Sequence, residues 1–345
     1  MTPRLLSREL VGAFFAVGSV SDSSPESPLS YVRTLQLPYW YQLPALREED
    51  MVRQFAYVIE GFEEKGEFTL DVDVYTYWGI LENNEPITID ESHAHGLYLL
   101  RALGTHFPVF KTQQTAPATM CFTIRDSRGH NLVSPSMLRF FTALMRRIAE
   151  WQYEFLSDFC DSVILCQDDP ALGFVLGIID KEDKSGLTVR QIVRETESVF
   201  PPRTIPSYHY CEDWRTLEYD GTHLLWETSP KIVHIDVLTY PPMISEKQSE
   251  KINRFLERGG AVALGVLPNT NDGYDRPVRQ LLERNLTSAL RLFADSGVDV
   301  SLLADNVLIS TQCGLSRASP ELVREIHHTS ECFPEVLEAV LGQTT

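Results

Sequence analysis

Short β-rich runs alternate with longer helical patterns along this 345-residue sequence, and this alternation limits its fold more than any other feature. The short runs are rich in Val, Ile, Leu or aromatic residues and end near Gly, Pro, Asn or Asp, which is typical of strands. They occur at residues 12–19, 38–42, 118–124, 162–167, 204–210, 232–240, 261–267 and 306–312.

Helical patterns separate these runs, with apolar residues three and four positions apart. They occupy residues 135–157, 246–257, 276–293 and 320–341, with further helices expected at 48–60 and from residue 93. Alternating strands and helices predict an α/β protein, here a single (β/α)8 TIM barrel formed by one domain over residues 1–345. A β-rich insertion is expected near residues 60–90, and a doubly wound sheet is the alternative fold.

Charge and hydropathy exclude several classes of partner. The net charge is −18, and no basic stripe suited to a nucleic acid or an anionic membrane surface is present. No apolar run approaches the ~20 residues that span a bilayer. We expect the short apolar run near the N-terminus to be the first strand of a cytoplasmic protein. The six cysteines are scattered, which favours reduced thiols over a disulfide framework.

Polar side chains gather where the predicted strands end. In a (β/α)8 barrel these carboxyl ends form the face that carries the chemistry. The residues at these ends are therefore the candidates for a binding or catalytic site: Ser19, Gln42, Asp168, Asp169, His209, Cys211, Tyr240 and Cys313.

His209 and Cys211 are two positions apart, so on an extended strand their side chains point to the same side. Cys313 ends another strand and precedes Gly314, which lets the backbone turn close to a site. One histidine and two cysteines suit tetrahedral zinc with a fourth position left open. The spacing alone also fits cysteines that are simply packed as small hydrophobic residues.

The same residues resemble a known family. His209-x-Cys211 and Cys313 in "STQCGLS" are similar to the zinc ligands of the cobalamin-independent methionine synthase catalytic barrel. That barrel shares a superfamily with uroporphyrinogen decarboxylase and the corrinoid-dependent methyltransferases. Further similar fragments occur in the same order, at "VGSV" (17–20), "CQDDPAL" (166–172) and "IDVLTY" (235–240). "PYWYQLP" and "HYCEDW" look closer still to the short, single-barrel members of this group.

The resemblance implies transfer of a methyl group to a zinc-bound thiolate such as that of homocysteine. Zinc would be held by His209, Cys211 and Cys313. Asp168 would meet the amino group of the substrate as the catalytic-site carboxylate, and Ser19 its carboxylate through the backbone. Gln42, Asp169 and Tyr240 are expected to complete the pocket. Capping of the following helix is the alternative role for the Asp168-Asp169-Pro170 stretch.

This sequence also departs from the family. The long methionine synthases use a glutamate as fourth zinc ligand, whereas the corresponding strand here ends at Thr239-Tyr240-Pro241. They also carry an extra N-terminal barrel that contributes to folate binding, for which this chain has no room. The expected methyl donor is a folate or, favoured by this difference, a methylated corrinoid, free or bound to a partner protein.

Two other functions fit the same superfamily. A metal-free decarboxylase-type enzyme would need basic residues at the barrel mouth, for which Arg125, Arg203 and Arg317 are available. A barrel that binds a corrinoid or a partner protein without catalysis is suggested by the missing glutamate.

Overall fold

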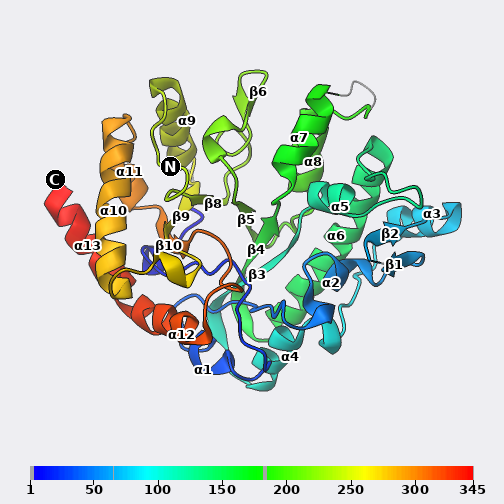
Figure 1. Cartoon of the computed structure of the whole chain (residues 1–345), viewed down its shortest axis with the longest axis horizontal. Helices are drawn as coiled ribbons and strands as arrows, with labels where there is room; N and C mark the ends of the chain where they lie inside the picture. The colour runs from blue at the N-terminus through cyan, green and yellow to red at the C-terminus, as the bar shows by residue number, and fades with distance from the viewer. Residues whose placement is uncertain (1–3, 65, 182–184, 345) are drawn as a thin grey trace.

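A curled parallel sheet forms the centre of the protein in the computed structural model, which describes residues 4–64, 66–181 and 185–344 (Figure 1). Its six strands are all parallel to their neighbours and follow the order β10-β9-β8-β5-β4-β3. They are β3 (Phe107–Thr115), β4 (Cys160–Asp168), β5 (Ile205–Tyr210), β8 (Ile232–Asp236), β9 (Ala261–Leu267) and β10 (Val307–Thr311).

Two extended N-terminal segments bridge the outer edges of this sheet. Phe14 makes a parallel bridge to Ile309 on β10, and Tyr39 makes one to Lys111 on β3. The two segments are themselves joined, because the backbone N–H of Gln42 donates to the carbonyl of Gly18 at 3.0 Å. The predicted runs at 12–19 and 38–42 are therefore extended and lie at the two sheet edges.

Helices surround the sheet in Figure 1. The helix predicted at 135–157 is confirmed as α6, where Ser134 caps the first turn and Pro135 opens it. The helix predicted at 246–257 is also confirmed, as α9. The helices are α1 (Leu29–Val32), α2 (Arg53–Ala56), α3 (Val74–Glu82), α4 (His95–Ala102), α5 (Pro117–Thr123), α6 (Pro135–Ser157), α7 (Leu172–Lys181), α8 (Val189–Ser198), α9 (Glu246–Glu257), α10 (Val278–Asp295), α11 (Val300–Ala304), α12 (Pro320–Thr329) and α13 (Phe333–Thr344).

Both faces of the sheet are buried, which explains why most of its strands read as continuous apolar runs. Val163 and Leu165 on β4 pack outward beneath the helices, whereas Ile164 and Cys166 belong to a separate inner cluster. Toward the carboxyl ends of the strands the inward positions become polar. Asp168 follows Cys166 on β4 at the two-residue spacing of one sheet face, and His209 lies beside it on β5. The curl of the sheet thus places polar side chains at one end of an apolar interior.

One predicted strand is wrong. Residues 118–123 lie in helix α5, which begins at Pro117, and Ile124 is its C-cap; the strand of this region is β3, which begins at Phe107 and ends at Thr115. β3 escaped prediction because its inward side chains include Lys111 and Gln113, which break the apolar pattern that predicts a buried strand.

The segment near residues 60–90 is only partly β-rich. A two-stranded antiparallel hairpin of β1 (Phe62–Glu64) and β2 (Phe68–Leu70) is present, but the "VYTYW" stretch lies in helix α3. The helix predicted at 48–60 is reduced to a 3-10 turn and the four-residue α2. A second small hairpin follows β5 and consists of β6 (Glu218–Tyr219) and β7 (Thr222–His223).

No helix in the described part of the chain is both long and apolar enough to cross a bilayer. All six cysteines are free thiols.

Candidate metal centre

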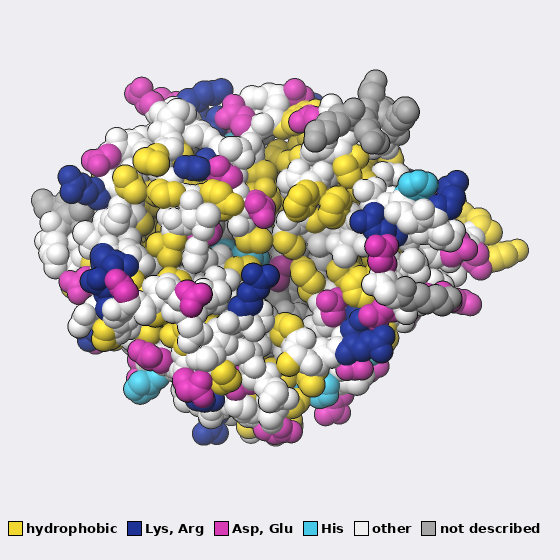
Figure 2. All heavy atoms as spheres, viewed as in Figure 1, with side chains coloured by type: hydrophobic (Ala, Val, Ile, Leu, Met, Phe, Trp, Pro, Cys, Tyr) yellow, Lys and Arg dark blue, Asp and Glu magenta, His cyan; other side chains and the backbone are white. Residues whose placement is uncertain are grey.

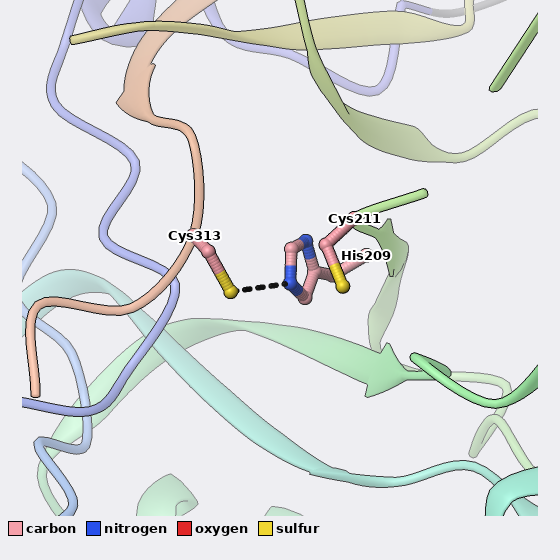
Figure 3. Close-up of side chains that lie close together, drawn as sticks. All are labelled: His209, Cys211 and Cys313. Carbon is pink, nitrogen blue, oxygen red and sulfur yellow. Dashed lines mark hydrogen bonds between the residues drawn. The ribbon is translucent and has the colours of Figure 1, made fainter. Parts of the chain in front are cut away.

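Three potential metal ligands meet at the carboxyl end of the curled sheet (Figure 3). His209 lies near the end of β5, Cys211 follows that strand, and Cys313 follows β10 from the opposite part of the sheet. One ligand atom from each residue lies within 4.8 Å of the others. His209 is buried, whereas the two cysteines are half-buried, so the cluster is open on the cysteine side. Sequence spacing predicted the His-Cys pair, and the fold brings Cys313 to it across 102 residues of chain.

A chain of hydrogen bonds runs from the cluster into the sheet interior. The Cys313 Sγ atom lies 3.6 Å from His209 Nε2. The other ring nitrogen, His209 Nδ1, lies 2.7 Å from Nδ1 of His234 on β8. His234 Nε2 in turn lies 2.8 Å from the backbone carbonyl oxygen of Thr311. Sequence reasoning missed His234, whose inward position depends on the β5–β8 register.

The three side chains shift one another's pKa values. Hydrogen bonds from the Cys211 thiol and from His209 lower the pKa of Cys313 despite its burial. The same thiol–thiol contact, together with burial, raises the pKa of Cys211. Burial lowers the pKa of His209, but its contact with Cys313 outweighs that effect and raises the pKa overall. The site therefore stabilises a thiolate on Cys313, and thiolate is the form in which cysteine binds a metal.

Asp168 lies beside this cluster, paired in register with His209 on the neighbouring strand. Its Oδ1 atom is buried and has no hydrogen-bond partner. Burial raises the pKa of the Asp168 carboxyl, while the positive charges of Lys111 and His209 oppose that rise. A buried carboxylate oxygen without a partner is costly, so this position suits a ligand that brings a hydrogen-bond donor or a positive charge.

Asp169 points away from the cluster. Its carboxylate accepts hydrogen bonds from the hydroxyls of Thr119 and Tyr208, each at 2.6 Å. Both partners are buried, and the Thr119 hydroxyl also accepts from the backbone N–H of Ala171. The two neighbouring aspartates thus have different surroundings: Asp169 connects α5 to β5 through two hydrogen bonds, whereas Oδ1 of Asp168 has no hydrogen-bond partner.

The other three predicted pocket residues each have partners of their own within the protein. Ser19 packs against Gly314, because a Cβ atom at Gly314 would lie 2.0 Å from Ser19 Oγ. The amide nitrogen of Gln42 donates to Gln54 Oε1 at 2.5 Å, so its side chain is engaged within the protein. Tyr240 lies in the loop after β8, where its hydroxyl donates to Glu212 at 3.4 Å.

A fourth protein ligand is not part of the cluster. Within the described ranges, the group of nearby ligand atoms consists of His209, Cys211 and Cys313 alone. Asp236, on the strand where a carboxylate ligand was expected, accepts hydrogen bonds from backbone N–H groups of Leu238 and Thr239. Its second oxygen accepts from Gln312 Nε2 at 3.1 Å. The arrangement thus offers an ion three protein ligands and one open position.

Hydrophobic side chains gather around the hollowed middle of the face seen in Figure 2, and histidine atoms are visible between them. The same view in Figure 1 looks onto the ring of helices around the sheet. The candidate centre itself lies at the carboxyl end of the curled sheet, where Cys211 and Cys313 are partly exposed.

Known proteins resemble this chain in structure. No family model matches the sequence, and no curated protein matches it. Among solved structures, a B12-independent methionine synthase from Shewanella sp. W3-18-1, in complex with selenomethionine, superposes with a TM-score of 0.58. The two are 12% identical, and the match covers 96% of this chain and 99% of the other. A methyltransferase from Methanosarcina mazei has a TM-score of 0.47 and 13% identity, with coverage of 96% and 99%. The chain therefore has the fold of the Shewanella protein over nearly its whole length.

Proposed function

We propose that this protein is a zinc-dependent methyltransferase that transfers a methyl group to a small thiol such as homocysteine. One observation carries the proposal: His209, Cys211 and Cys313 bring their ligand atoms within 4.8 Å of one another from two separate strand ends. Packing of scattered cysteines does not require this convergence. The fold likeness to a methionine synthase supports the same reading.

The donor set suits zinc. Thiolate sulfur and imidazole nitrogen are the ligands of zinc sites, and catalytic sites keep three protein ligands with a fourth position open. Bound zinc would supply a position at which a substrate thiol is held deprotonated and nucleophilic near neutral pH. The lowered pKa of Cys313 prepares that residue to act as a thiolate ligand.

Binding of an amino-acid thiol would be completed by residues around the cluster. We propose that Asp168, whose buried Oδ1 has no partner, receives the substrate ammonium group. Ser19, packed against the residue after Cys313, would offer its backbone to the substrate carboxylate. Tyr240 would border the entrance. Gln42 and Asp169 would support the pocket from behind, since their side chains are engaged by Gln54, Thr119 and Tyr208.

The position of Asp168 orients the substrate. An ammonium group held there fixes one end of the amino acid beside His209, so that its sulfur is directed to the open side of the two cysteines. The burial of Asp168 excludes water from this contact, which strengthens the attraction. The methyl donor approaches from the mouth; a methylated corrinoid or a folate is the proposed donor, and a corrinoid protein is the proposed partner in the first case.

We further propose that residues 1–345 form one barrel domain. The extended segments around Phe14 and Tyr39 would then be its first two strands, which completes eight positions with the six strands of the sheet. The β1–β2 hairpin and α3 would be additions to that barrel.

The decarboxylase alternative has less support. It needs several free basic side chains at the mouth, but two of the three candidates, Arg125 and Arg203, are engaged, which leaves Arg317. Arg125 lies 3.6 Å from Glu67. Arg203 is stacked over the ring of Tyr153, 4.5 Å from its centre.

Methyl transfer to homocysteine tests the proposal. Zinc-loaded protein is incubated with homocysteine and either methylcobalamin or a methylated folate, and methionine is measured. Methionine formation with either donor is the expected result. Its absence with both donors, together with binding of an acidic tetrapyrrole by metal-free protein, would favour the decarboxylase; corrinoid binding without turnover would favour the non-catalytic barrel.

A further inference from the structure

His234 is a buried histidine that contacts a candidate metal ligand without belonging to the ligand cluster. It lies on β8 directly beside His209 on β5, in the parallel register of those two strands. Its side chain has 0% exposure. The two imidazole rings meet nearly edge to face, with centroids 4.5 Å apart. The ring of Phe15 stacks on the His234 ring with centroids 6.1 Å apart.

The partners of His234 determine which of its nitrogens carries the proton. Nε2 lies 2.8 Å from the Thr311 carbonyl oxygen, which can only accept a hydrogen bond, so Nε2 must donate. A neutral imidazole has one N–H, so Nδ1 of His234 is then an acceptor. The ring is fully buried, and its two polar contacts are a carbonyl oxygen and another imidazole, neither of which is an anion that would offset a buried positive charge, so the ring is neutral.

This assignment extends to His209. Its Nδ1 atom lies 2.7 Å from the acceptor Nδ1 of His234, so it must be the donor in that contact. Nε2 of His209 is the nitrogen that faces Cys313. A metal ligand needs an unprotonated nitrogen, and the proton on Nδ1 leaves Nε2 able to serve.

We propose that His234 is a positioning residue that holds His209 in the Nδ1–H tautomer and aims its Nε2 atom at the metal. We call the hydrogen-bonded series of His209, His234 and the Thr311 carbonyl the relay; the carbonyl fixes the ring of His234 at the end far from the metal. His234 itself is not a ligand, since both of its nitrogens are engaged and it lies outside the cluster of ligand atoms found among the described residues. The proposal rests on the zinc site of the proposed function and adds the residue that orients one of its ligands.

Two substitutions test separately the contact of His234 with His209 and its contact with Thr311. In His234→Asn, the amide oxygen replaces Nδ1 and can still accept from His209, but the contact with Thr311 is lost. In His234→Gln, the amide nitrogen replaces Nε2 and can still donate to Thr311, but the acceptor for His209 is lost. The two variants are similarly polar. If His234 had only a structural role, zinc affinity would not be lower in His234→Gln than in His234→Asn.

Zinc affinity is measured by competition with a chromophoric chelator in the wild type and both variants. We expect His234→Asn to bind zinc nearly as the wild type does, and His234→Gln to bind about 10- to 100-fold more weakly, the usual cost of losing such a partner. Urea denaturation of the metal-free proteins checks that each variant is folded. Equal affinities in the wild type and His234→Gln, or a loss confined to His234→Asn, would overturn the proposal.

A measurement on the wild type does not depend on the folding of any variant. The ring 15N shifts of His209 in the zinc-loaded protein report which nitrogen carries the proton. A protonated Nδ1 and a zinc-bound Nε2 are expected, and the opposite assignment contradicts the relay. Failure of the wild type to bind zinc would reject the proposed function and this inference together, whereas normal zinc binding by His234→Gln would reject the inference alone.

Discussion

Substitutions of the two neighbouring aspartates at the end of β4 are expected to have opposite effects, which isolates the proposed role of Asp168. Asp168→Asn should weaken the binding of homocysteine to zinc-loaded protein, because it removes the negative charge that would receive the substrate ammonium. The structure indicates little cost to stability, since Oδ1 of Asp168 is buried without a hydrogen-bond partner and the side-chain hydrogen bond of this carboxylate is with the weakly polar thiol of Cys166. The matched control is Asp169→Asn, which removes one carboxylate oxygen from an equally polar but fully engaged neighbour.

The magnitudes follow from the contacts. A hydrogen bond between charged groups contributes about 1.5–3 kcal/mol, so Asp168→Asn should raise the dissociation constant for homocysteine about 10- to 150-fold. Its free energy of unfolding should stay within about 1 kcal/mol of the wild type. In Asp169→Asn, one of the hydrogen bonds from Thr119 and Tyr208 loses its charged acceptor. We expect a loss of about 2–3 kcal/mol in unfolding free energy and little change in homocysteine affinity.

Isothermal titration calorimetry with homocysteine and urea denaturation measure the two quantities on the same preparations. Unchanged homocysteine affinity in Asp168→Asn would refute the assigned role. The reasoning would also fail if Asp169→Asn lost more affinity than Asp168→Asn, because the neighbour whose carboxylate points away from the cluster would then be the one that recognises the substrate.

Two further predictions concern the backbone near the site and the response to pH. Gly314→Ala should weaken zinc binding, because its Cβ would overlap Ser19 Oγ and lie 3.3 Å from Ser19 Cβ, so that the Ser19 side chain must rotate or the loop must move. Gly79→Ala in exposed α3, where a Cβ would meet no atom within 4 Å, should instead add about 0.5–1 kcal/mol of stability. Equal zinc affinity in Gly314→Ala and the wild type would contradict the first expectation. Burial lowers the pKa of His327 from 6.5 to about 4, so the unfolded state binds more protons between those values. The contribution of His327 to the unfolding free energy should therefore fall by about 3 kcal/mol when the pH drops from 6.5 to 4. Urea titrations at several pH values measure this change. His327→Gln should make the unfolding free energy less dependent on pH, and the same slope in this variant and the wild type would contradict the expectation.

The strands that are apolar on both faces were predictable from sequence, and β3, which is equally buried but partly polar, was not. β9 and β10 are runs of Val, Ala, Leu and Ile because both faces are covered, so their apolar character stands out locally. β3 carries Lys111 and Gln113 on its inner face, where Lys111 Nζ donates to Gln113 Oε1 at 2.9 Å. Their other partners are the backbone carbonyls of Val17 and Trp40, which lie far away in the sequence, so no local pattern identifies the strand.

The candidate centre also contains residues that the sequence pattern predicts and residues that it does not. His209 and Cys211 are related by strand spacing, which the sequence displays directly. Their convergence with Cys313 depends on the curl of the sheet, and resemblance to a family was needed to expect it. The role of His234 depends on a still finer quantity, the register between β5 and β8. A histidine inside an apolar strand was the available signal, but sequence alone does not say which residue stands beside it.

Zinc content tests the central claim most directly. Purified wild-type protein is analysed by inductively coupled plasma mass spectrometry beside Cys211→Ser, Cys313→Ser and a control, Cys332→Ser. The Cys332 thiol lies outside the ligand cluster and donates to the Thr329 carbonyl oxygen at 3.0 Å. We predict stoichiometric zinc in the wild type and in the control, and a large loss in the other two variants. A wild type without zinc after growth with added zinc, or equal zinc in all four proteins, would contradict the account.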